Sequence, residues 1–183
     1  MDFSYLYDPI LRMFELIPEI IVLNIFMIIA TYTDCKSMKI YNKFNLAMLI
    51  TRVVWLIGLA IFYPAGVSIG YVLDCLFGAL VLCLCFWIPA AISGDSIGGD
   101  IKFAFNLGLW CGSIPSLFLA LIGALLNVVF RLFFGKKEEK EIHSQRILNY
   151  GHVFFKATGR VPLAPFFYAG YIVLFIAHFF LPV

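Results

Sequence analysis

Long apolar runs constrain this chain more than any other feature of its sequence. A hydrocarbon core needs roughly 20 residues per helical crossing, and five runs come close to or exceed that length. The sequence is 63% hydrophobic and only 13% charged, whereas soluble domains usually hold about 25% charged residues. This composition excludes an ordinary soluble domain and predicts a polytopic helical membrane protein. The five runs are approximately residues 16–33, 46–65, 67–92, 113–130 and 162–183.

A shorter apolar segment, residues 101–112, decides the topology. If it crosses the membrane, eleven of the thirteen basic residues fall on one face, and only Arg12 and Arg52 lie elsewhere. The positive-inside rule therefore favours six spans, with both termini outside and the loop 135–159 in the cytoplasm. The sequence predicts an all-α, six-span transmembrane bundle that forms one domain over residues 1–183.

Two acidic residues stand at the ends of apolar segments on the predicted cytoplasmic face. Asp34 ends the first run, Asp100 opens the short segment, and each has a lysine two positions later. Carboxylates at membrane helices are costly to keep, and two that lie close together share a proton and titrate as a pair. The ionised carboxylate can accept a proton from water while the neutral one hydrogen-bonds a peptide carbonyl. The pair therefore indicates aspartic peptidase chemistry.

Two glycines precede the second aspartate, in Gly98-Gly99-Asp100. Glycine permits close backbone approach and positive φ, which would suit a substrate strand beside Asp100, and we expect Lys102 to support this loop. A 12-residue helix is about 18 Å long, so the short segment fits best if the glycines dip into the membrane. Asp95 could hold the loop or tune the carboxylate pair, although a solvated loop acid is the simpler interpretation. Composition alone also allows a simple polar loop here.

Three segments resemble signatures of the type IV prepilin peptidases. Asp34, followed after five residues by Ile40-Tyr41-Asn42, is similar to the family's Asp-x5-Ile-Pro-Asn. Residues 98–103, Gly-Gly-Asp-Ile-Lys-Phe, resemble its Gly-x-Gly-Asp-x-Lys-Leu, and residues 161–166 resemble its Ile-Pro-Phe-Gly-Pro-Phe. The sequence departs from these signatures at three positions: Tyr41 for proline, Ile97 for glycine and Phe103 for leucine.

The resemblance implies a minimal, peptidase-only member of the GxGD-type intramembrane aspartic proteases, with Asp34 and Asp100 as the catalytic pair. It implies membrane-embedded prepilin-like precursors as partners, each with a short basic leader before a hydrophobic helix. Cleavage is then expected on the cytoplasmic side of the cell membrane, in type IV pilus assembly or protein secretion. No Cys-x-x-Cys pair of the bifunctional members occurs. We expect no cofactor, no metal and no nucleic-acid partner.

Two other functions remain open on the sequence. A small transporter or channel could use Asp34, Asp74 and Asp100 as cation or proton sites, although it leaves the spacing from Asp34 to Asn42 unexplained. An inactive relative could simply bind pilin-like helices. Arg52 and Asp74 lie inside apolar runs. We expect Arg52 to snorkel toward the cytoplasmic surface or pair with an acid, and Asp74 to reach water or a polar neighbour.

Overall fold

The computed structural model describes residues 17–37, 39–62, 69–93, 98–141 and 162–180. These residues form six helices and contain no strand, which confirms the predicted all-α bundle. The helices are α2 (Ile17–Ser37), α3 (Asn42–Phe62), α4 (Ile69–Ser93), α5 (Gly98–Cys111), α6 (Ser113–Glu141) and α7 (Ala164–Phe180).

Four helices are long and apolar enough to cross a membrane on their own. Their candidate spans are Pro18–Ser37, Asn42–Phe62, Ile69–Ile88 and Ser113–Phe130. The apolar part of α7, Ala164–Ala177, is shorter, and α5 has only 14 residues. Large apolar side chains are exposed on the outer faces of the long helices, as a lipid-facing surface requires. The chain is therefore a multi-pass, all-α membrane protein.

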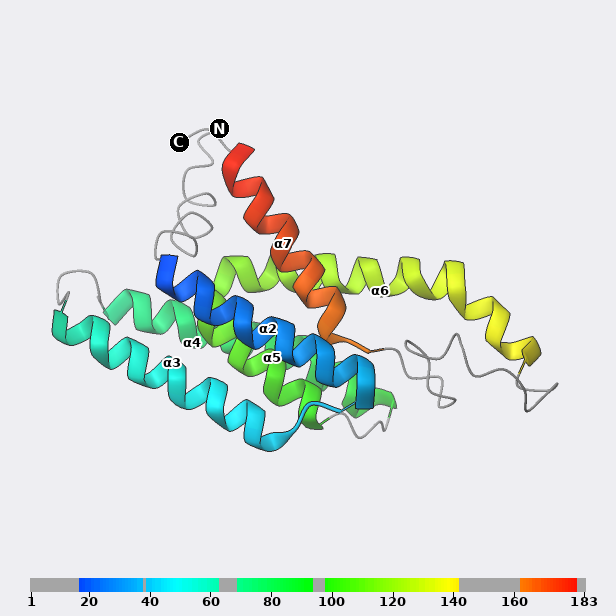
Figure 1. The fold of residues 1–183 in the computed structure, drawn as a ribbon, viewed down its shortest axis with the longest axis horizontal. Coiled ribbons are helices and arrows are strands. Elements are labelled where there is room, and N and C mark those ends of the chain that lie inside the picture. The colour runs from blue at the N-terminus through cyan, green and yellow to red at the C-terminus, as the bar shows by residue number, and fades with distance from the viewer. Residues whose placement is uncertain (1–16, 38, 63–68, 94–97, 142–161, 181–183) are drawn as a thin grey trace.

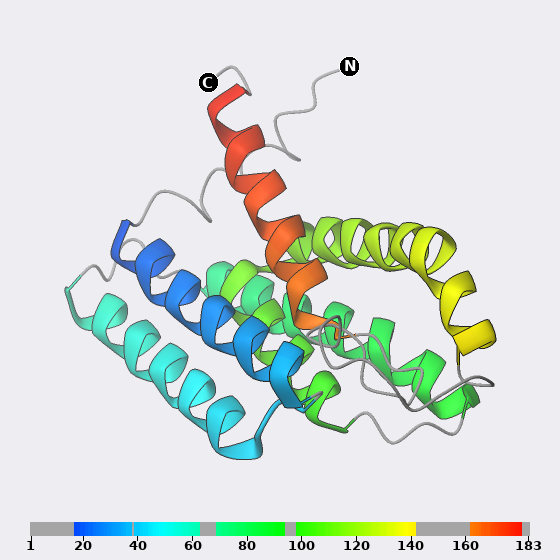
Figure 2. The same cartoon turned by 45° about the vertical axis from the view of Figure 1, so that its right-hand side comes forward.

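Helix α5 occupies the centre of the bundle. Helices α2, α3, α4 and α5 run side by side, while α6 crosses behind them and α7 rises at a steep angle (Figures 1 and 2). Eight of the 14 residues of α5 are buried, and Phe103, Leu107 and Trp110 belong to the main apolar core. The shortest helix is thus the one most enclosed by protein, which leaves little of its backbone to lipid.

Glycines set the contact between α4 and α5. A Cβ atom on Gly78 would lie 2.5 Å from the Gly108 carbonyl oxygen, and one on Gly108 would lie 2.2 Å from the Gly78 oxygen. Small residues of this kind let membrane helices approach backbone to backbone. Gly112, with φ of 83°, then ends α5 and turns the chain into α6. The α4–α5–α6 arrangement therefore depends on these three positions.

Two predicted boundaries differ from the structure. Helix α2 continues to Ser37, so Asp34 lies in its last turn rather than after it. Helix α6 continues to Glu141, so the first residues of the predicted cytoplasmic loop 135–159 are helical. The Lys and Glu residues after Gly135 are good helix formers that extend an existing helix. The rest of that loop lies outside the described residues.

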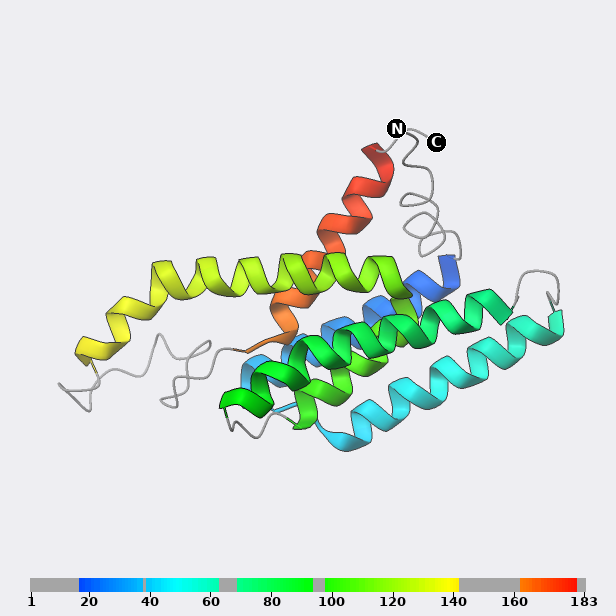
Figure 3. The ribbon, with the colours of Figure 1, turned by 180° about the vertical axis from the view of Figure 1, so that it is seen from behind.

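The three signature segments meet at one end of the bundle. Helix α2 ends there, and α3, α5 and α7 begin there (Figures 1 and 3). We call this the motif end. Its position follows from the chain direction, because α2 and α4 run toward it while α3 and α5 run away from it.

Candidate active site

Asp34 is buried at the motif end, where it meets the start of α7. Its side chain is only 3% exposed. Its Oδ2 atom accepts hydrogen bonds from the backbone N–H groups of Leu163, at 2.6 Å, and Ala164, at 2.9 Å. The first N–H groups of a helix have no partner within the helix, so Asp34 caps α7 from a different helix. This contact joins the first signature segment to the third.

Burial disfavours a negative charge on Asp34, and the same two hydrogen bonds act against this effect. Backbone N–H groups at a helix N-terminus carry partial positive charge, and hydrogen bonds to an ionised carboxylate are stronger than neutral ones. Leu163 and Ala164 therefore stabilise a negative charge on Asp34 and fix the orientation of its carboxylate. Both N–H groups donate to Oδ2, so these hydrogen bonds hold one oxygen of the Asp34 carboxylate.

Backbone contact joins the first signature segment to the second. A Cβ atom on Gly99 would lie 2.7 Å from the Ile40 carbonyl oxygen, so the α5 N-terminus packs directly on the segment between α2 and α3. Lys102 Nζ donates a hydrogen bond to Asn42 Oδ1 at 3.0 Å. The structure thus places Gly99 and Lys102, two predicted supporting residues, against Ile40 and Asn42.

Two buried asparagines, which the sequence analysis did not single out, strengthen this junction. Asn45 Nδ2 donates to the Gly99 carbonyl at 3.1 Å, and Asn106 Nδ2 donates to the Asn45 carbonyl at 2.8 Å. Each asparagine is only 4% exposed. The sequence feature that could have identified Asn45 was its spacing from Asn42, because residues three apart share a helix face. Buried amides facing α5 tie α3 to the residue just before Asp100.

Asp100 lies in the first turn of α5 and is partly buried. The ends of α2 and α5, which carry the two predicted catalytic aspartates, lie side by side in all three ribbon views (Figures 1 to 3). Gly98, one residue from the tight contact at Gly99, has open space around its Cα. The remaining predicted residue, Asp95, falls outside the part of the chain that the structure describes.

The expectation of positive φ at Gly98 and Gly99 was wrong. Both residues belong to α5, and among the described glycines a positive φ occurs at Gly112. Gly99 is required by proximity instead, since a side chain there would collide with the Ile40 backbone. The loop before Asp100 is therefore shorter than expected, because the helix begins at the first glycine.

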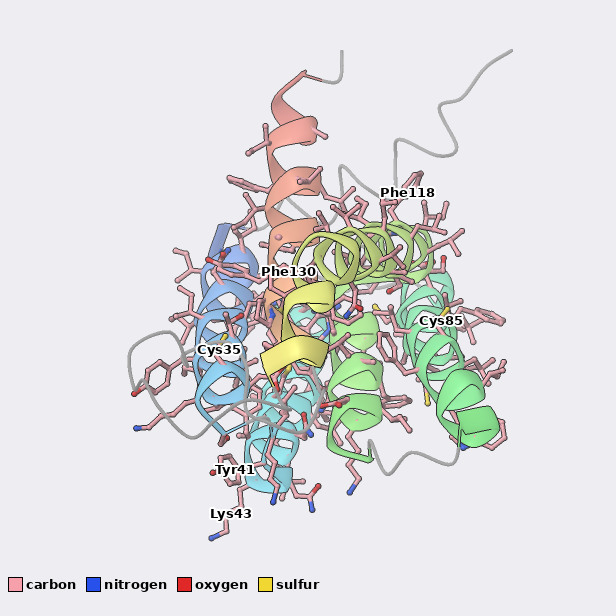
Figure 4. All side chains as sticks on the ribbon, turned by 90° about the vertical axis from the view of Figure 1, so that its right-hand side faces the viewer. Cys35, Tyr41, Lys43, Cys85, Phe118 and Phe130 are labelled. Carbon is pink, nitrogen blue, oxygen red and sulfur yellow. The ribbon has the colours of Figure 1, made fainter. Side chains whose placement is uncertain are left out.

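Exposed basic residues surround the motif end: Lys36, Lys39, Lys43 and Lys102 are all exposed. Figure 4 shows Tyr41 and Lys43 pointing away from the helices at this end. Tyr41 is 55% exposed, so the side chain that replaces the signature proline does not enter the site.

The two charged residues that the sequence placed inside apolar runs, Asp74 and Arg52, have protein partners. Asp74 Oδ1 accepts hydrogen bonds from the N–H and the hydroxyl of Ser113, so Asp74 caps α6 as Asp34 caps α7. Arg52 forms an ion pair with Glu19. Asp74 therefore contacts a polar neighbour and Arg52 pairs with an acid, as two of the alternatives from the sequence predicted. Within the described residues, no three His, Cys, Asp or Glu side chains gather as metal ligands do.

The architecture and the acidic site together define the class as a polytopic membrane protein with a buried and a partly buried carboxylate at one end of its helices. A family model described as the type IV leader peptidase family matches residues 21–132, more than half of the chain. The chain belongs to this family and is a peptidase. The match includes Asp34 and Asp100 and ends before the α7 segment. No curated protein and no solved structure matches the chain.

Proposed function

We propose that the protein is an aspartic endopeptidase that removes the leader from type IV prepilin-like precursors, with Asp34 and Asp100 as the catalytic residues. One observation carries the proposal. Three signature segments that are far apart in the sequence meet through Asp34 and α7, through Gly99 and Ile40, and through Lys102 and Asn42. A transporter has no need for all three contacts, whereas a peptidase needs its acid groups held rigidly.

We propose different roles for the two carboxylates. Asp34 receives two backbone N–H donors that stabilise its charge, so it acts as the general base. Asp100 acts as the general acid, because one member of such a pair keeps the shared proton. Water loses a proton to Asp34 as its oxygen attacks the scissile carbonyl carbon, and Asp100 protonates the carbonyl oxygen. Asp34 then gives its proton to the leaving nitrogen as the C–N bond breaks, and a hydroxyl group of the tetrahedral diol returns a proton to Asp100 as the product carboxyl group forms.

The proposed substrate enters at the motif end. A prepilin-like precursor places its scissile bond between a short basic leader and a hydrophobic helix, at the boundary of the bilayer. Open space at Gly98 leaves room beside Asp100 for an extended strand. The exposed lysines at this end favour a cytoplasmic position, so cleavage occurs on the cytoplasmic face of the cell membrane.

A precursor reporter in reconstituted membranes tests this proposal. The reporter has a basic leader followed by an apolar helix, and mass spectrometry of the product identifies the new N-terminus. Asp34→Asn and Asp100→Asn should each abolish cleavage while the protein stays folded, and the double variant should be no worse than either single one. Asp95→Asn is the control and should keep measurable activity.

Two further measurements separate the enzyme classes. The wild-type pH profile should be bell-shaped, because two coupled carboxyl groups must hold one proton between them. Chelators should leave cleavage intact. Wild-type turnover by Asp34→Asn would refute the aspartate pair, and loss of activity on chelation that added zinc restores would make the aspartates metal ligands. Ion flux without cleavage would favour the transporter.

A further inference from the structure

The C-terminal end of α5 lies inside the bundle and not at its far edge. Helix α5 has 14 residues, which gives a length of about 21 Å, whereas a hydrocarbon core is about 30 Å thick. Figures 1 and 3 show the α5–α6 turn set back from the end of the bundle that α3 and α4 form. Leu109, Trp110 and Cys111 are all buried there. The helix therefore ends at a depth where water does not solvate its carbonyl groups.

The last carbonyls of a helix need donors from outside the helix, and Arg52 supplies them. Arg52 Nε donates to the Leu109 carbonyl at 3.0 Å, and Nη2 approaches the Trp110 carbonyl at 3.4 Å. The guanidinium also lies over the Trp110 ring, 5.0 Å from its centroid. Arg52 is completely buried. Its contacts with α5 are therefore made without competition from water.

Glu19 balances the charge that this capping brings into the bundle. Arg52 Nη1 forms an ion pair with Glu19 Oε1, and Glu19 Oε2 accepts a hydrogen bond from Trp55 Nε1 at 3.2 Å. Arg52 Nη2 also donates to the Tyr71 hydroxyl at 3.1 Å. Every nitrogen of the guanidinium thus has a partner. We call Glu19, Arg52 and Tyr71, with the end of α5, the Arg52 cluster.

We propose that Arg52, neutralised by Glu19, is a positioning residue that caps α5 inside the bilayer and so fixes the depth of Asp100 at the opposite end of the same helix. The inference rests on the function proposed above. A helix is stiff along its axis, so holding its last turn restricts axial movement of its first turn. The Gly78–Gly108 contact sets the spacing of α4 and α5, whereas the Arg52 cluster holds the end of α5.

The alternative is an ion pair that contributes to stability alone, and a charge-neutral double variant separates the two. Arg52→Met combined with Glu19→Gln removes both charges and keeps an acceptor for Trp55. Replacing a buried ion pair with neutral groups is often tolerated, whereas removing one partner alone is strongly destabilising. The double variant nevertheless leaves the Leu109 and Trp110 carbonyls without their donor. The variant therefore removes the cap without leaving an unpaired charge, and the comparison of kcat with KM distinguishes a positioning role from a purely structural one.

The experiment measures leader cleavage, the melting temperature and amide hydrogen exchange of the full-length protein in membranes. We expect the double variant to stay folded, with a melting temperature lowered only by the loss of the two carbonyl donors, and to keep its KM within about twofold, because substrate binding is unchanged. Its kcat should fall on the order of 10²-fold, the scale on which a displacement of about 1 Å acts in an active site. Exchange should rise in the C-terminal half of α5 and stay low in α4.

Tyr71→Phe is the matched control, since it removes one partner of the guanidinium while Arg52 keeps its own contacts with the Leu109 and Trp110 carbonyls, and it should keep kcat within about twofold of wild type. Wild-type kcat and unchanged α5 exchange in the double variant would overturn the inference. If that variant does not fold, Arg52→Lys replaces it. The ammonium group of lysine can pair with Glu19, but it has no guanidinium fork to cap both carbonyls. Reduced kcat in Arg52→Lys therefore supports the inference, and wild-type kcat contradicts it. Failure of the wild-type protein to cleave refutes the proposed function, whereas the exchange data still test the capping.

Discussion

The contact between Gly99 and Ile40 gives the sharpest test of the active site, because the neighbouring glycine provides a matched control. A methyl group at position 99 would lie 2.7 Å from the Ile40 carbonyl oxygen, against at least 3.4 Å for an ordinary contact. The obstacle is backbone, which cannot rotate away as a side chain can. Gly99→Ala therefore requires the first turn of α5 to move by about 0.7 Å, a displacement close to the ~1 Å that disables active sites.

The expected consequence is specific to the chemical step. Overpacking of this kind costs about 1–3 kcal/mol, and the shift acts on the residue directly before Asp100. If this strain also raises the energy of the transition state, kcat falls roughly 5- to 140-fold, since about 1.4 kcal/mol corresponds to a factor of ten. Gly98→Ala meets nothing within 4 Å and should leave kcat near the wild-type value.

The assay is cleavage of the precursor reporter over a range of substrate concentrations, with the melting temperature measured on the same samples. Both glycines lie in α5 without positive φ, so alanine suits the backbone conformation at each position. The difference between the two variants therefore reports the Ile40 contact alone. Equal activity of Gly99→Ala and Gly98→Ala, whether high or low, would refute the reasoning.

The remaining predictions concern other contacts of the motif end and the topology. Asn45→Ala leaves the Gly99 carbonyl without its donor and should lower the free energy of unfolding by about 1–3 kcal/mol, whereas Asn42→Ala breaks an exposed bond and should cost less; equal melting temperatures would contradict this. Ala164→Pro suits the first position of a helix but deletes a donor to Asp34, so kcat should fall roughly tenfold, and unchanged kcat would show that the bond is dispensable. Cysteines at positions 137 and 65 should react from opposite sides of the membrane, and labelling of both from the same side would contradict six spans.

Apolar periodicity and length were sufficient to predict the helices, because a membrane span has to satisfy its backbone internally. The six predicted segments correspond in order to the six described helices. The boundaries were less predictable where polar residues continue a helix, as at Asp34 in α2 and at the charged end of α6. Length and hydropathy mark where the lipid ends, whereas a helix ends where its capping residues and neighbours stop it.

The candidate site was predictable as far as its aspartates, glycines and signature lysine, because these residue types stand out against apolar runs. The contacts that hold these residues in place were less predictable. Asp34 is held by backbone N–H groups of α7, and a backbone donor cannot be identified from the residue type. The partner of Arg52 was not predicted, although Glu19 lies within an apolar run, because pairing across helices depends on how the bundle packs.

The position of Tyr41 bears on whether the departures from the family signature disable the enzyme. A proline-to-tyrosine change at the centre of a site would move the backbone or fill the substrate space. Tyr41 instead points outward (Figure 4), and its carbonyl accepts the first hydrogen bond of α3, from the N–H of Asn45, at 3.1 Å. The contact that joins the two aspartate segments is made by the Ile40 carbonyl and Gly99, neither of which is a departure. The change at Tyr41 therefore alters the surface of the motif end and leaves the junction beneath it intact, which favours an active peptidase over a relative that only binds pilin-like helices.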